Sequence, residues 1–289
     1  MKPIYLQWVL KCLPKRTISR WMGKMARKSW SRKLIPIYIR YFQVDLTPVK
    51  KPIHEFENLL AFFIRELRSD MRPVAEGDHL IISPVDGTIS QVGEIQEGKL
   101  FQAKGMTYSL EELLGHQKKY VQAFLGGRFI TIYLSPRDYH RFHMPLDGRI
   151  VACAHLPGEL YPVNPFVANY IKGLFVVNER LISYIDTMFC GKVAMVKIGA
   201  TNVGSIKVSY DQNIATNQKA KKELCQTYEP AYRYKKGEEL GWFEFGSTVI
   251  LLFEPNQIDW MNHCVPGAKV QMGQAVARIL KNGGEAIEP

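Results

Sequence analysis

Short apolar segments bounded by Gly, Pro and Asp most strongly constrain what this 289-residue chain can fold into. Runs of about four to eight strand-forming residues between such turn residues are typical of β-strands. The predicted strands are 79–83, 88–92, 128–134, 149–155, 192–198, 202–209, 239–245 and 248–253. Two turn-strand stretches, 84–88 and 266–270, suggest the halves of a barrel-sandwich hybrid. We therefore predict an α+β fold with a mostly antiparallel β core.

Helical spacing of apolar residues adds a small number of helices to this core. Residues 55–71 have one apolar face and are predicted to form a helix that packs on the core. Ser109 and Glu112 form a capping box, which predicts a short helix ending near Gly115. The segment 211–237 is polar, rich in Lys and without clear periodicity, so we predict a long surface loop there.

The positive charge of the chain is concentrated at its N-terminus. Residues 1–50 carry twelve Lys and Arg against one acid, Asp45, while basic and acidic residues balance in the remainder, so the net charge of +11 lies on this arm. The arm contains two amphipathic helical patterns, with apolar residues at Tyr5, Trp8, Val9, Cys12 and Leu13 and then at Ile18, Trp21, Met22 and Met25. Basic residues with interfacial tryptophans favour a helix lying on an anionic bilayer.

Three alternatives to a membrane-surface helix remain open for the basic arm. It could be a solvated basic helix docked on its own domain, a nucleic-acid-binding arm or a mitochondrial transit peptide. A continuous apolar face argues against nucleic acid, and the scarcity of Ser argues against a transit peptide. We expect residues 1–72 to form a membrane-associating helical region and residues 73–289 a β-rich catalytic domain, with no nucleic-acid partner.

The cysteines and the hydropathy pattern favour an intracellular protein. The five cysteines are scattered without C-x-x-C spacing, which argues against a disulfide framework and a zinc knuckle. The sequence contains no apolar run approaching the length of a membrane span and no secretory signal pattern. We expect a peripheral protein in a reducing compartment.

Three polar clusters interrupt the apolar pattern and could carry chemistry. The first places Asp86 in the turn Ser83-Pro84-Val85-Asp86-Gly87, and the second places His140 and His143 in Tyr139-His140-Arg141-Phe142-His143. The third is Gly246-Ser247-Thr248 inside an apolar strand pattern, where Gly weakens a strand. Taken singly, these clusters are also compatible with a turn aspartate, loop histidines and a β-bulge.

Together the clusters supply an acid, a histidine base and a serine nucleophile. Ser247 lacks a Gly-x-Ser-x-Gly elbow, and a serine within a strand has the carbonyl of Gly246 as its nearest electrophile. Two rival functions remain open. One is a serine hydrolase or peptidase that uses Asp86, His143 and Ser247 on an external substrate, and the other is a non-catalytic, membrane-bound β adaptor.

The same motifs resemble those of the bacterial, pyruvoyl-dependent phosphatidylserine decarboxylases. The resemblance covers essentially the whole chain in order. The matching stretches are 83–87, 139–143, Gly246-Ser247-Thr248, the basic start at 13–24, 166–170 and 178–180. One departure is Phe245, where the family most often has leucine, and both residues are apolar.

This resemblance implies a proenzyme that cleaves itself between Gly246 and Ser247 into a large chain 1–246 and a small chain 247–289. His143, oriented by Asp86, would activate Ser247, which becomes a pyruvoyl group that forms a Schiff base with phosphatidylserine and releases CO₂. We assign protonation of the product to His140. The cofactor is self-derived, so neither a metal nor pyridoxal phosphate is expected.

The resemblance also implies partners and a location. The substrate is phosphatidylserine in an anionic membrane surface, and the product is phosphatidylethanolamine. The large and small chains would stay together as a heterodimer, and a homodimer of that unit is plausible. The expected location is the cytoplasmic face of the bacterial inner membrane, with the enzyme bound peripherally.

Overall fold

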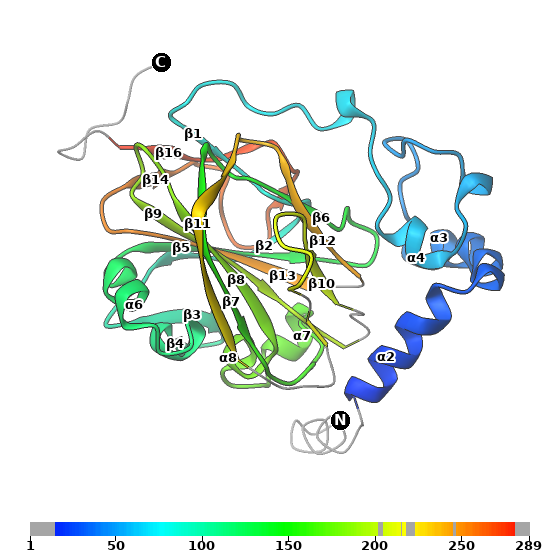
Figure 1. The fold of residues 1–289 in the computed structure, drawn as a ribbon, viewed down its shortest axis with the longest axis horizontal. Helices are drawn as coiled ribbons and strands as arrows, with labels where there is room; N and C mark the ends of the chain where they lie inside the picture. The colour runs from blue at the N-terminus through cyan, green and yellow to red at the C-terminus, as the bar shows by residue number, and fades with distance from the viewer. Residues whose placement is uncertain (1–14, 202–204, 215, 218–222, 245–246, 281–289) are drawn as a thin grey trace.

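The computed structural model describes residues 15–201, 205–214, 216–217, 223–244 and 247–280 (Figure 1). Its fold is α+β, with a mostly antiparallel β core and a helical segment at one side. The predicted fold class is therefore confirmed at this level. The first amphipathic helical pattern of the arm and Gly246 lie outside the described residues.

An eight-stranded antiparallel sheet forms the centre of the molecule, in the order β11-β7-β8-β9-β13-β5-β2-β15. Its strands are β2 (Gly87–Glu94), β5 (Arg128–Leu134), β7 (Gly148–Leu156), β8 (Arg180–Asp186), β9 (Lys192–Ile198), β11 (Leu224–Tyr234), β13 (Ser247–Phe253) and β15 (Lys269–Val270). In β13 every residue is buried, because β5 and β9 pair with it on either side.

Three smaller sheets complete the β structure. The first has the order β10-β12-β6, with β6 (Arg141–His143), β10 (Ile206–Val208) and β12 (Glu239–Phe243). The second has the order β1-β16-β14, with β1 (Leu80–Ile82), β14 (Ile258–Trp260) and β16 (Ala275–Ile279). The third is a hairpin of β3 (Lys99–Ala103) and β4 (Met106–Ser109).

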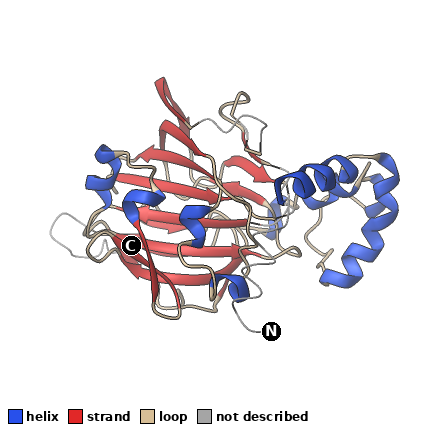
Figure 2. Ribbon diagram, turned by 90° about the horizontal axis from the view of Figure 1, so that it is seen from below, coloured by secondary structure: helices blue, strands red, loops and turns tan. Residues whose placement is uncertain are grey.

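Helices lie at one side of the β core and over one face of it (Figures 1 and 2). The N-terminal helices are α2 (Lys15–Ala26), η1 (Ser29–Leu34), α3 (Ile35–Phe42), η2 (Ile53–Glu55), α4 (Leu59–Phe63) and η3 (Ser69–Met71). Those beside the sheet are α5 (Leu110–Leu113), α6 (Lys118–Phe124), α7 (Pro165–Ala168) and α8 (Leu174–Val177). In the described part of the chain, no helix combines the length and apolar character needed to cross a bilayer.

The apolar core forms a layer on each face of the central sheet, because side chains alternate between the faces along each strand. Val249, Leu251 and Phe253 of β13 belong to one layer, whereas Ile250 and Leu252 belong to the other. The first layer also contains Val85 and Phe142, from the two sequence motifs that precede β13.

Two predicted elements were wrong. Residues 55–71 form η2, α4 and η3 rather than one helix, because the chain turns out of α4 after Phe63. The predicted loop 211–237 contains the edge strand β11, which pairs with β7. The predicted helix near Gly115 is confirmed as α5, whose Ser109 side chain accepts a hydrogen bond from the N–H of Glu112.

The two stretches with shared turn-strand character lie side by side. Lys269 pairs with Thr88 and Val270 with Gly87, which joins β15 to β2 at the edge of the large sheet. This pairing places the turn that carries Asp86 at a fixed position at the sheet edge. A Cβ atom on Gly87 would lie 2.5 Å from the Tyr133 carbonyl oxygen, so the turn requires glycine there.

Candidate active site

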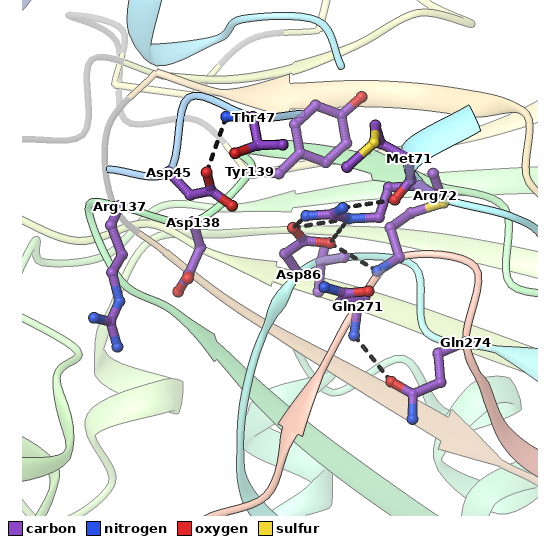
Figure 3. Close-up of polar contacts among 12 residues, drawn as sticks. Asp45, Thr47, Met71, Arg72, Asp86, Arg137, Asp138, Tyr139, Gln271 and Gln274 are labelled. Atoms are coloured by element: carbon purple, nitrogen blue, oxygen red, sulfur yellow. Dashed lines mark hydrogen bonds and ion pairs between the residues drawn. The ribbon is translucent and has the colours of Figure 1, made fainter. Parts of the chain in front are cut away.

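Asp86 lies between β1 and β2, and an arginine from the N-terminal segment holds its carboxylate. Arg72 Nε donates to the two carboxylate oxygens at 2.9 and 3.1 Å, and Arg72 Nη2 forms a second bond to the same group. The backbone N–H of Met272 donates to Asp86 Oδ1 at 2.8 Å. Figure 3 shows the guanidinium of Arg72 facing Asp86, with the ring of Tyr139 beside them. The buried carboxylate of Asp86 is thus paired with a cation and fixed in direction.

His143 lies on β6 directly beside the Asp86 turn. Its backbone N–H donates to the Pro84 carbonyl at 2.9 Å. Its Nδ1 lies 2.8 Å from the Gly237 carbonyl oxygen, which can only accept, so Nδ1 carries the proton in the neutral ring. Nε2 is then the acceptor, and the hydroxyl of Tyr139 donates a hydrogen bond to it at 3.1 Å. The lone pair of a histidine base is therefore at Nε2.

Burial decides the charge of His143. The loss of hydration lowers the pKa of His143 below its ordinary value, opposed by the Gly237 carbonyl and by the charges of Glu239 and Asp86. Near neutral pH the ring is therefore uncharged and able to accept a proton.

His140 lies three residues earlier and is fully buried. Its Nδ1 donates to the Asp138 carbonyl at 2.8 Å, and its ring packs against Phe63 of α4 at a centroid distance of 4.0 Å. Its Nε2 has no hydrogen-bond partner among the described residues. Burial lowers the pKa of His140 to about 3. The structure thus presents a neutral imidazole with an unused lone pair.

Ser247 is the first residue of β13 and pairs with Leu134 of β5. Its side chain is fully buried, and its Oγ has no hydrogen-bond partner in the described structure. Strand alternation directs Ser247 to the same face as Val249 and Leu251, the face whose layer contains Val85 and Phe142. The nucleophile candidate therefore faces the layer that supports the Asp86 turn and the histidine motif.

The backbone also ties the strand before Ser247 to the histidine motif. The N–H of Phe243, at the end of β12, donates to the His140 carbonyl at 2.9 Å, and β12 pairs with β6. The sequence motifs of Asp86, His140 and His143 thus meet around one strand end.

Not every expected contact within the site is present. The hydrogen bonds of Asp86 go to Arg72 and Met272, while those of the His143 ring go to Gly237 and Tyr139. No hydrogen bond joins Asp86 to His143 among the described residues, although the Asp86 charge acts on the His143 ring. Sequence reasoning did not identify Arg72 or Tyr139. Tyr139 could have been found from its place in the histidine motif.

The chain belongs to the phosphatidylserine decarboxylase family, a family of carboxy-lyases. The family model described as phosphatidylserine decarboxylase matches residues 59–278. A phosphatidylserine decarboxylase proenzyme of Brevibacillus brevis is 48% identical over 265 residues, which covers 92% of this chain and 94% of the relative. Proenzymes with the same description from Myxococcus xanthus and Azotobacter vinelandii are 40% and 41% identical. They cover 94% and 92% of this chain and 97% and 95% of their own lengths.

The resemblance identified from the sequence motifs is therefore confirmed. Membership of this family supports a decarboxylase rather than a serine hydrolase or an adaptor. Among the described residues, no group of three or more His, Cys, Asp or Glu side chains could hold a metal ion.

Proposed function

We propose that this chain is a proenzyme that cleaves itself between Gly246 and Ser247 and then decarboxylates phosphatidylserine to phosphatidylethanolamine. The observation that carries the proposal is the Ser247 hydroxyl, which is fully buried yet has no partner among the described residues. An unpaired buried hydroxyl is costly, so its presence at the head of a central strand favours a chemical role. A neutral histidine in the neighbouring motif supports the same role.

In the first reaction, His143 Nε2 accepts the proton of Ser247 Oγ. For this step the hydroxyl of Ser247 has to replace the hydroxyl of Tyr139 as the hydrogen-bond donor to His143 Nε2. The Oγ attacks the carbonyl carbon of Gly246, the C–N bond to Ser247 breaks, and the nitrogen takes a proton, which converts the amide to an ester. Loss of the Ser247 Cα proton then expels the Gly246 carboxylate, and addition of water to the resulting double bond releases ammonia and leaves a ketone.

The residues around Ser247 fit a pyruvoyl group at this position. The group is about as small as the serine from which it derives, and the serine site is closed to solvent with no hydrogen bond to be broken. When present, a pyruvoyl group accepts the electrons released as CO₂ leaves the substrate. The surrounding residues of the chain must then exclude water and move protons.

His140 is the residue that we assign to proton transfer in the second reaction. The His140 ring is neutral in the described structure, so Nε2 must take up a proton before His140 can deliver one. Solvent is the source of that proton, because conversion of an amino acid to an amine and CO₂ consumes one proton. His140 then delivers the proton to the carbon that lost CO₂. The contact of Nδ1–H with Asp138 fixes the ring for both transfers.

Replacing Ser247 with alanine tests the cleavage proposal. We expect Ser247→Ala to remain a single chain with no decarboxylase activity, because neither the ester nor the ketone can form. Ser209→Ala, which alters an exposed serine, is the matched control and should be cleaved normally. An uncut wild-type chain that is active and reacts with a fluorophosphonate at Ser247 would instead support the hydrolase.

We also propose that the N-terminal helices bring the enzyme to the membrane as a peripheral protein on the cytoplasmic face of the bacterial inner membrane. Trp21, Trp30, Ile37 and Tyr41 have 61, 47, 65 and 78% of their surface exposed, and they lie among basic residues. Exposed aromatic and aliphatic side chains beside Lys and Arg are typical of helices that lie in an anionic interface. The cleaved chains would remain together as a heterodimer, because β13 lies between β5 and β9.

Removing the two exposed tryptophans tests the membrane proposal. Trp21→Ser/Trp30→Ser should weaken binding to vesicles containing phosphatidylglycerol by about tenfold or more, because apolar burial in the interface is lost. The measurement is cosedimentation with vesicles at low and high salt. Met188→Ser/Phe189→Ser is the control, because these exposed residues lie at the opposite end of β8 from the α2 contact at Glu179. Equal loss in both variants would contradict a specific role for the helices.

A further inference from the structure

The helix α2 packs beside α4, and its arginines reach residues next to the strands of the β core. Arg16 forms an ion pair with Glu179 at 3.7 Å, and Arg20 Nε donates to the Asn217 carbonyl at 3.2 Å. Ser19 and Gly23 are buried on the same side of the helix. Trp21 is 61% exposed because it lies about 200° around the helix axis from Ser19. One helix can thus contact the protein on one side while its Trp21 side remains free.

Arg27, immediately after α2, contacts Glu244, which lies three residues before Ser247 in the sequence. Its Nη2 lies 2.5 Å from Glu244 Oε2. The Glu244 side chain is 8% exposed, whereas that of Arg27 is 46% exposed. Ser205 Oγ donates to the same carboxylate oxygen at 2.8 Å. Arg27 is the charged partner of Glu244 among the described residues, so its loss would leave a buried carboxylate without a cation.

Glu244 and Ser247 bracket the proposed processing segment, with two residues between them. On one side, Ser247 pairs with Leu134, and the next residue, Thr248, pairs with strands on both sides. On the other side, the backbone N–H of Glu244 donates to the Ser205 carbonyl at 2.9 Å. Attack of a serine on the preceding carbonyl needs both ends of so short a segment to be held, because small misplacements cost large factors in rate.

We propose that Arg27 is a positioning residue for self-cleavage, acting through Glu244 to fix the strand end that leads into Gly246 and Ser247. The inference rests on the proposed cleavage at this bond. It gives α2 a second role besides the proposed membrane contact. Arg27 does not touch the reacting atoms, and it acts by neutralising and orienting the carboxylate that anchors residue 244.

The experiment follows cleavage of pulse-labelled full-length chains during cell-free synthesis without membranes. Arg27→Met retains the aliphatic stem but removes the charge, and we expect it to slow cleavage roughly tenfold. Arg27→Lys retains the charge and should keep most of the wild-type cleavage rate. Arg68→Met is the matched control, because Arg68 is 49% exposed and pairs with the exposed Asp70. Its cleavage should match that of the wild type.

A double variant separates positioning from general destabilisation. With Glu244→Gln present, the buried charge is gone, so adding Arg27→Met should slow cleavage little further. If Arg27→Met slowed cleavage by misfolding the chain, it would slow cleavage just as much in the Glu244→Gln background.

Two results would overturn the inference while leaving the proposed function intact. One is a wild-type rate in Arg27→Met, and the other is a double variant whose defect equals the product of the two single defects. A failure of the proposed function looks different, because the wild-type chain would then produce no fragment ending at residue 246.

Discussion

His143→Ala is expected to leave the chain uncut, with cleavage slowed by about 10²- to 10⁴-fold. The physical reason is that Ser247 Oγ then loses the base that we propose accepts its proton, at a side chain that is fully buried. Electrophoresis of freshly synthesised protein measures the loss directly. His116→Ala is the control, since the His116 side chain is 69% exposed and pairs with a surface glutamate.

The pH profile of cleavage provides a second readout for His143. The base works only when its ring is neutral, and burial lowers its pKa. Cleavage should therefore change little near neutral pH and decline only as the pH falls below about 6.5, the ordinary histidine value. Normal cleavage in His143→Ala would assign the base to another group, and a decline that starts above pH 7 would contradict the neutral ring.

His140→Ala is expected to separate the two reactions. Cleavage should continue, because the proposed mechanism gives His140 no part in the attack on Gly246, whereas decarboxylation should fall by about 10²- to 10⁴-fold. The measurements are fragment formation and release of labelled CO₂ from carboxyl-labelled phosphatidylserine. Because His140 is buried against Phe63, His140→Gln serves as a second variant that preserves more of the packing.

Loss of cleavage in both His140 variants would contradict this division of roles. Full decarboxylase activity in the cleaved variants would also contradict it, because the proton would then come from elsewhere. Retained cleavage also shows that the variant has folded, which makes the loss of the second reaction interpretable.

The β core could be predicted from sequence because its strands are apolar on both faces. The predicted ranges 128–134 and 192–198 match β5 and β9. β11 could not be predicted, because an edge strand exposed on both faces has no apolar alternation. Helical spacing over 55–71 failed because Arg65 leaves the helix and donates to the carbonyls of Arg137 and Asp138. A long-range contact outweighed local propensity.

The candidate site shows the same contrast. Asp86, His140, His143 and Ser247 could be selected from local motifs, because each sits beside a glycine, a turn or a second polar residue. Arg72 could not, because its ion pair with Asp86 joins segments whose proximity is created only by the fold. Arg27 and Glu244 lie far apart in the sequence and had no local signal for the same reason.

The intact mass of the purified wild-type protein under denaturing conditions tests the central claim most directly. The account predicts two polypeptides that divide between Gly246 and Ser247, with the fragment 247–289 lighter by one ammonia and carrying a ketone that reacts with hydrazine. An active preparation consisting of one uncut chain, or a small fragment that begins with an unmodified serine, would contradict it.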